Sequence, residues 1–96
     1  MFVNRRTFVV KKGKMDEALA RFRTREGPDQ SRVVRIYTSE VGAFNTIAFE
    51  AEFESPQEFE SFFARLPDLP ELAEAQAKLA GLTVPGGSNE VWRLVE

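Results

Sequence analysis

The chain has 96 residues, of which 43% are apolar and 29% charged, a size and composition typical of one domain spanning residues 1–96. It contains no cysteine and no histidine, which excludes disulfides, thiol nucleophiles, imidazole metal ligands and Ser-His or Cys-His catalytic pairs. Its longest apolar runs, such as Phe8-Val9-Val10, have three residues. We therefore expect no membrane span, no signal peptide and a cytoplasmic location.

The net charge of −2 hides an uneven distribution of charge along the chain. Residues 1–35 hold ten basic and four acidic side chains, a net +6, whereas residues 36–96 hold three basic and eleven acidic ones, a net −8. A basic patch for nucleic acid or anionic lipid is one interpretation. We favour the other, in which basic and acidic elements lie side by side, because so small a domain cannot keep them apart.

The first predicted strand covers Val3–Lys11, which is rich in β-branched and aromatic residues and precedes a turn at Gly13. From Lys14 the apolar residues recur at helical spacing, which predicts an amphipathic helix ending at Gly27-Pro28. Its apolar positions are Met15, Ala18, Leu19 and Phe22.

Two segments, 32–39 and 45–54, alternate between apolar and polar residues and predict a β-hairpin. A slip of one residue would turn one apolar set to the wrong face, so the loop needs an even length, and we expect two or four residues. This register sets Ile36 beside Ile47 and Val34 beside Phe49.

A second helix is predicted to begin at Ser55, with Pro56 in its first turn and Glu58 reaching back to complete a capping box. Its apolar stripe, formed by Phe59, Phe62, Phe63 and Leu66, is expected to pack in the core. After Pro67 a shorter helix should begin at 68–71, with Leu69, Leu72, Gln76 and Leu79 on one side. Residues 81–89 are expected to form a flexible connection, followed by a last strand over 90–95.

This order of elements predicts an α+β, ferredoxin-like βαββαβ sandwich, with a four-stranded antiparallel sheet and helices on one face. The other face carries a mixed set of side chains that is too apolar for comfortable exposure. Packing against a second copy would cover it and give a homodimeric α/β barrel. On that face Arg35 could pair with Glu50 or Glu52.

Two stretches resemble a known family. The run Arg6–Lys14 resembles the opening strand of NIPSNAP-like proteins, in which an Arg-Thr-aromatic sequence leads into a Lys-x-Gly-Lys turn. Residues 45–55, with the following Glu58-Phe59-Glu60, resemble that family's third strand and second helix. The resemblance implies a dimeric α/β barrel, in a superfamily that also holds antibiotic-biosynthesis-type monooxygenases and haem-degrading enzymes. It implies small-molecule or partner binding and no settled chemistry.

The chain departs from these relatives at several polar positions. Haem-degrading relatives use an Asn where this chain has Arg6, and a His of which the chain has none, so a haem held by imidazole is excluded. NIPSNAP-like proteins usually have a His and a Trp where Phe49 and Ala51 stand here.

Other kinds of site are disfavoured by the residues present. Glu50, Glu52 and Glu54 lie along one strand face and would spread instead of converging on a metal ion, so we expect no metal. The aromatic platform of the RNA-recognition module is absent, because Ala43 and Asn45 stand at its stacking positions. No phosphate-binding loop or nucleophile elbow occurs, and we expect no nucleic-acid partner and no cofactor.

We therefore expect a homodimer that binds a small, partly apolar ligand in a cavity between sheet and helices. Arg6, Phe8, Tyr37 and Trp92 are its predicted lining: guanidinium groups suit anions, and the only Tyr and Trp each combine an apolar body with one polar atom. For Arg6 and Arg35 cross-strand ion pairs are the alternative, and for Tyr37 and Trp92 a role at the interface. A cofactor-independent monooxygenase and a purely structural interaction module remain as alternatives, and no catalytic residue is assigned.

Overall fold

Strand β1 (Phe2–Val10) lies in the middle of the sheet and pairs with a neighbour along each edge. The structure is a computed structural model that describes residues 1–24 and 32–95, so the predicted helix end at Gly27-Pro28 lies outside the described residues. The elements after β1 are α1 (Met15–Thr24), β2 (Val34–Thr38), β3 (Thr46–Phe53), α2 (Pro56–Arg65), the 3-10 turn η1 (Leu66–Asp68), α3 (Pro70–Ala80) and β4 (Thr83–Arg93).

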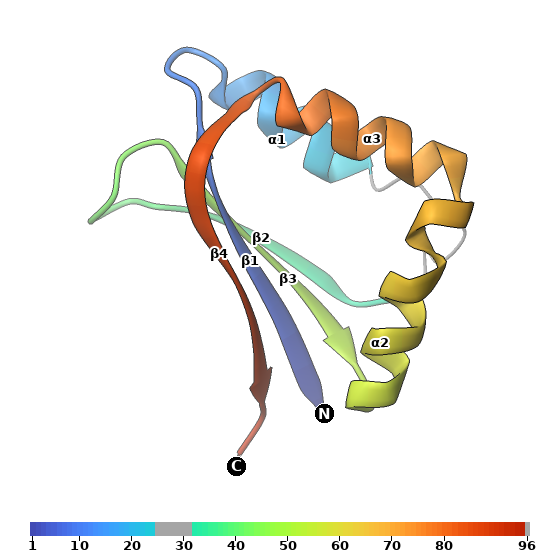
Figure 1. The fold of residues 1–96 in the computed structure, drawn as a ribbon. Helices are drawn as coiled ribbons and strands as arrows, with labels where there is room; N and C mark the ends of the chain where they lie inside the picture. The colour runs from blue at the N-terminus through green and yellow to red at the C-terminus, as the bar shows by residue number, and fades with distance from the viewer. Residues whose placement is uncertain (25–31, 96) are drawn as a thin grey trace.

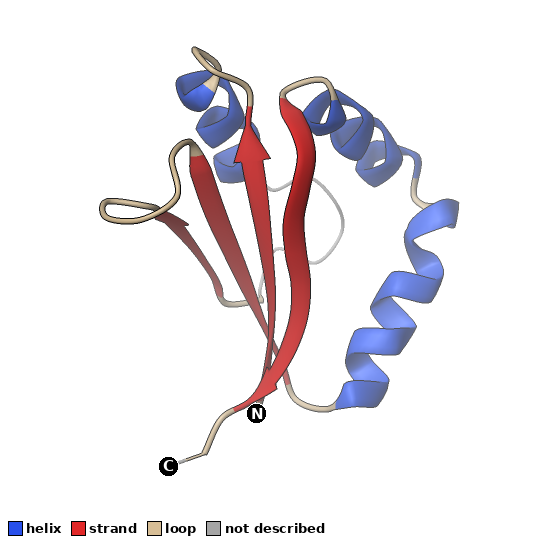
Figure 2. Cartoon of the chain, turned by 60° about the vertical axis from the view of Figure 1, so that its left-hand side comes forward, coloured by secondary structure: helices blue, strands red, loops and turns tan. Residues whose placement is uncertain are grey.

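The four strands form one antiparallel sheet in the order β2-β3-β1-β4. Helices α1, α2 and α3 lie on one side of this sheet, and no helix of the described chain covers the other side (Figure 1, Figure 2). The two ends of the chain meet at one end of the sheet, where the amide of Leu94 donates to the carbonyl of Met1 at 3.0 Å. The predicted α+β, ferredoxin-like arrangement is confirmed.

The core lies between α1 and the middle of the sheet. Its buried residues come from α1, β1, β3 and the turn before β4: Val10, Ala18, Phe22, Ile47 and Leu82. The predicted apolar stripe of α1 supplies Ala18 and Phe22, and the Phe22 ring lies 5.2 Å from that of Phe8. In contrast, neither α2 nor α3 contains a buried residue. The helical layer is therefore anchored to the sheet mainly through α1.

The start of α2 follows the predicted chemistry with one change. The Ser55 hydroxyl accepts a hydrogen bond from the Glu58 amide at 3.1 Å, and Pro56 occupies the first turn. The Glu58 carboxylate, however, accepts from the amide of Glu54 at 2.7 Å. It reaches one residue further back than the capping-box prediction, because Glu54 is the last residue before the cap and its amide is free of the sheet ladder. The next helix, α3, has 11 residues against 10 in α2, so the expectation that it is shorter was wrong.

The predicted register of the β2–β3 hairpin is wrong by two residues. Ile36 pairs with Phe49 and Val34 with Ala51, and the Ser39 amide donates to the Thr46 carbonyl at 3.1 Å. The loop therefore covers 40–45, six residues instead of two or four. Gly42 and Asn45 take positive φ values of 120° and 55°, which builds a wider turn than a tight hairpin. The even length is preserved, so both apolar sets still face the helices.

The segment 81–89 was expected to be a flexible connection, and this prediction was wrong. Strand β4 begins at Thr83 and pairs with β1, with an irregularity in register between Thr7 and Val9. Gly86 and Gly87 lie at this irregularity with φ of 131° and 92°. A proline and two glycines are tolerated there because β4 is an edge strand that bulges instead of breaking.

Candidate functional site

A cavity of about 210 Å³ lies between the helix-facing side of the sheet and the three helices. Roughly 150 Å³ is enough to hold a benzene molecule in an apolar protein interior, so this space fits a ring with a small substituent. Its wall is mainly apolar and includes six phenylalanine rings, those of Phe8, Phe22, Phe49, Phe53, Phe62 and Phe63. No aspartate or glutamate is among the described residues that line it.

Arg6 lies in the middle of β1, opposite Phe49 on β3 and Asn89 on β4, with its side chain on the helix-facing side. Its guanidinium carbon is 5.4 Å from the centroid of the Phe8 ring and 5.8 Å from that of Phe63. No hydrogen bond or ion pair joins this group to any other residue in 1–24 or 32–95. Burial lowers the pKa of the Arg6 guanidinium from its ordinary value, because desolvation penalises the charged form.

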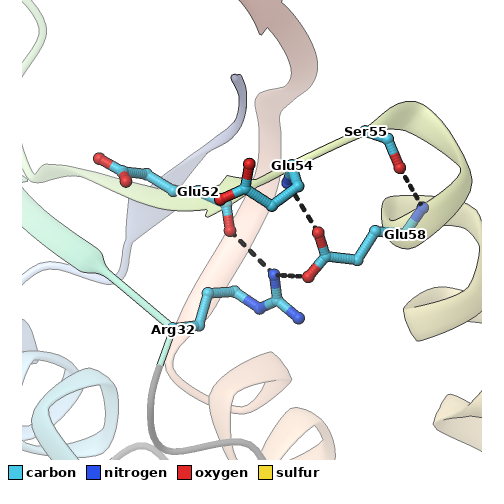
Figure 3. Close-up of polar contacts among 5 residues, drawn as sticks. All are labelled: Arg32, Glu52, Glu54, Ser55 and Glu58. Carbon is cyan, nitrogen blue, oxygen red and sulfur yellow. Dashed lines mark hydrogen bonds and ion pairs between the residues drawn. The ribbon is translucent and has the colours of Figure 1, made fainter.

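Arg32 also lines the cavity, but its charge is compensated. Its Nη1 donates to a Glu58 carboxylate oxygen at 2.8 Å and to the Glu52 carbonyl at 2.9 Å (Figure 3). Arg32 stands just before β2, Glu52 is in β3 and Glu58 is in α2, so this group joins the segment before β2 to β3 and to the second helix. Arg21, from α1, lines the cavity as well and interacts with other groups of the chain.

Asn4 is the one polar residue of the described chain that is fully buried, with 3% of its surface exposed. Its amide nitrogen donates to the Asn89 side-chain oxygen at 2.7 Å and to the Glu90 carbonyl at 2.9 Å. Both amide hydrogens are therefore used within the protein. Asn4 can only accept a hydrogen bond from a molecule in the cavity.

No protein-family model and no curated protein matches the chain. Among solved structures it is similar to an uncharacterized NIPSNAP domain protein from Burkholderia xenovorans, with a TM-score of 0.82, 19% identity, and coverage of 99% of this chain and 95% of that one. A NIPSNAP family protein from Agrobacterium tumefaciens gives a TM-score of 0.80 at 16% identity, covering 99% and 93% of the two chains. The chain has the NIPSNAP fold.

The chain is also similar in fold to structures outside the NIPSNAP proteins. A solved antibiotic biosynthesis monooxygenase matches this chain with a TM-score of 0.71 at 13% identity, over 100% of both chains. The resemblance predicted from the residues around Arg6 and Phe49 is thus confirmed as a likeness of fold. At these identities the likeness extends to the fold alone.

The four residues predicted to line one cavity lie on two faces of the NIPSNAP-fold sheet. Arg6 and Phe8 line the cavity. Tyr37 pairs with Ala48 and Trp92 with Val3, which places both on the opposite, uncovered face. The prediction of a single lining that includes all four therefore needs correction. Arg6 is beside Phe49 and Tyr37 is beside Ala48, and neighbouring residues of a strand point to opposite sides of the sheet. Binding of a ligand by Arg6 and Phe8 remains a prediction.

Several lining residues were not proposed from the sequence. Phe49 is on the same face of β3 as Ile47, so the alternation placed it correctly while its part in a cavity was not foreseen. Gln76 lines the cavity from α3, beside Leu72 and Leu79. A lone amide on the apolar side of that helix was the available signal.

The uncovered face carries the charge pairs expected between β2 and β3. Arg35 contacts Glu52 at 2.6 Å, which confirms one of its two predicted partners and raises the Arg35 pKa through that hydrogen bond. Arg5 pairs with Glu50 at 3.5 Å, whereas Arg6 forms no such pair within the described chain. In the same described ranges, no group of three carboxylate, imidazole or thiol side chains is arranged to hold a metal. Nor does any described helix have the length and hydrophobicity to cross a membrane.

Proposed function

We propose that this protein is a homodimer that binds a small, partly apolar molecule in the cavity between its sheet and its helices. The observation that carries the proposal is the Arg6 guanidinium, which lies in an aromatic cavity with no ion pair in the described chain. Taking a cation from water without a partner costs stability. A partly buried cation without an ion pair is typical of a site where the cation binds a ligand.

The homodimer rests on the uncovered face of the sheet. Tyr37, Val84 and Trp92 are 44%, 38% and 56% exposed in the single chain, and they lie on this face with the pairs Arg5–Glu50 and Arg35–Glu52. Aromatic and aliphatic groups interleaved with arginines are typical of protein interfaces. A two-fold axis through the face would bury both copies of this surface together.

The second candidate function is a cofactor-independent monooxygenase. It is favoured by the likeness of fold to an antibiotic biosynthesis monooxygenase. Against it, the described lining of the cavity contains no carboxylate, thiol, imidazole or phenol to remove a proton from a substrate. Arg6 would be left to stabilise negative charge on a substrate that supplies its own reactivity. Oxygen uptake with an anthrone-like or quinol substrate, lost in Arg6→Ala, would favour this function over binding.

Native mass spectrometry of freshly purified protein tests the proposal, because it reports subunit number and any retained small molecule together. We expect a dimer with an additional mass that disappears on denaturation. A dimer that carries no additional mass and takes up no added apolar molecule would favour a structural interaction module. A monomer at micromolar concentration in sedimentation would contradict the homodimer. The predicted cytoplasmic location is part of the proposal and is checked by cell fractionation.

A further inference from the structure

The cavity has a charge balance that selects its ligand. Three guanidinium groups line it, those of Arg6, Arg21 and Arg32, and no described lining residue is acidic. Arg32 is paired with Glu58, and Arg21 interacts with other groups of the chain. Arg6 has only ring contacts among the described residues. It therefore presents an uncompensated positive charge to the cavity.

The surroundings of Arg6 restrict how this charge can be used. The rings of Phe8 and Phe63 lie 5.4 and 5.8 Å from the guanidinium carbon, so the group is within cation–π distance of two apolar walls. In such surroundings a charged hydrogen bond is stronger than in water. A guanidinium presents parallel N–H donors that match the two oxygens of a carboxylate. Asn4 has no donor left, so on β1 an anion can be held by Arg6 alone.

The remaining volume sets the size of the apolar part. A space of about 210 Å³ exceeds the roughly 150 Å³ that holds benzene. Phe22 and Phe49, whose ring centroids are 5.4 Å apart, both line the cavity and give a hydrocarbon an apolar surface to contact. A phosphate dianion would bring two negative charges to the single Arg6 guanidinium.

We propose that the ligand of this cavity is a monocarboxylic acid with an apolar body about the size of one aromatic ring, and that Arg6 binds its carboxylate through two parallel hydrogen bonds. This inference rests on the proposed function, since it names the class of molecule that the cavity takes. Arg6 then confers specificity for an anion, while the phenylalanine rings contact the hydrocarbon.

The test compares an acid with its neutral analogue of the same shape. Phenylacetate and phenylacetamide are titrated into the purified protein, with binding followed by calorimetry and by NMR shifts of the cavity residues. We expect phenylacetate to bind at least about tenfold more tightly, because a two-pronged charged hydrogen bond is lost with the amide. In Arg6→Met the preference should disappear, while measurable binding of phenylacetamide shows that the cavity is intact.

Two further variants sharpen the result. Arg6→Lys keeps the charge without the planar fork and should retain only part of the preference. Arg5→Met is the matched control, since Arg5 is the adjacent residue of the same strand but lies on the uncovered face with Glu50. It should leave the preference unchanged. Raising the salt concentration should weaken the binding of phenylacetate more than the binding of phenylacetamide.

The outcomes separate this inference from the proposed function. If acid and amide bind equally well, or if Arg6→Met keeps the preference for the acid, the assignment of Arg6 is wrong while ligand binding in the cavity stands. If neither compound, nor their shorter homologues benzoate and benzamide, shifts any cavity resonance, both the inference and the binding function are overturned.

Discussion

The guanidinium carbon of Arg32 lies 4.0 Å from the centroid of the Phe53 ring. Phe53 is 3% exposed and contacts Phe59 at 5.4 Å between centroids, so the cation covers the end of an aromatic cluster. Glu58 then neutralises the cation from α2. The start of the second helix is thereby fixed to the end of β3 at one point.

Removing this fixation should be costly. Glu58→Ala deletes the acceptor for both the Glu54 amide and Arg32 and leaves a partly buried guanidinium without its carboxylate. We expect the free energy of unfolding to fall by about 2 kcal/mol, the usual loss for a hydrogen bond to a charged group. Glu60→Ala, the same change on the exposed side of α2, should cost less than about 0.5 kcal/mol. Equal losses in urea denaturation would contradict the role of Glu58.

Replacing Arg6 should stabilise the protein in the absence of ligand. Arg6→Met keeps an unbranched, apolar stem beside the phenylalanine rings and removes a desolvated charge, so we expect a gain of about 1 kcal/mol, or roughly 4–8 °C in Tm. The pKa of Arg6 is lower in the folded state than in the unfolded state. The charged form therefore reduces stability at every pH below the folded-state pKa. This loss of stability disappears only when the pH rises through that pKa, in the strongly alkaline range. The gain should therefore be constant from pH 5 to 9. A loss of stability in thermal melts would show that Arg6 is structural.

Gly87 allows β4 to approach β1. A Cβ atom at this position would overlap the carbonyl oxygen of Thr7, and φ is 92°. Gly87→Ala should destabilise by about 3 kcal/mol or more, since strain and a backbone clash add. Gly13→Ala is the control: φ is 82° but nothing lies within 4 Å, so only the backbone strain, about 1 kcal/mol, is expected. Chemical denaturation of the two variants measures the difference.

The predicted dimer is tested at Ala48. Its cross-strand partners on the uncovered face are Thr7 and Tyr37, which places it at the centre of that face. Ala48→Arg adds a charge that a single chain can hold in water but a closed interface cannot, and it should shift sedimentation at micromolar concentration to the monomer. Ala64→Arg, on the exposed side of α2, should remain dimeric. A dimer in both variants would place the interface elsewhere.

The sequence predicted the elements whose signals are local. The cap at Ser55 and the apolar stripe of α1 depend on residues a few positions apart, and the structure confirms them. Pro85-Gly86-Gly87 has the same local signal as a turn, yet it lies in β4. Hydrogen bonding with β1 outweighs that local signal. Because β1 is distant in the sequence, this pairing cannot be read from the residues of the segment itself.

The candidate site was only half predictable for a related reason. Alternation assigns Phe8 and Arg6 to one face and Tyr37 to the other once the strand order is known. The cavity itself depends on the distance between α2, α3 and the sheet, which follows from packing and leaves no pattern in the sequence. Trp92 was misplaced because its register with Val3 depends on the irregularity earlier in β4.

The lack of buried residues in α2 and α3 has a consequence for how the molecule opens. Strand β1 is bonded on both edges, so its amides should exchange with solvent deuterium only through global unfolding. The amides of α2 and α3 should exchange through smaller, cheaper openings in which this half of the helical layer detaches while the sheet persists. The wall of the cavity is then the first part of the molecule to loosen, and a molecule that fills the cavity should slow exchange there before anywhere else.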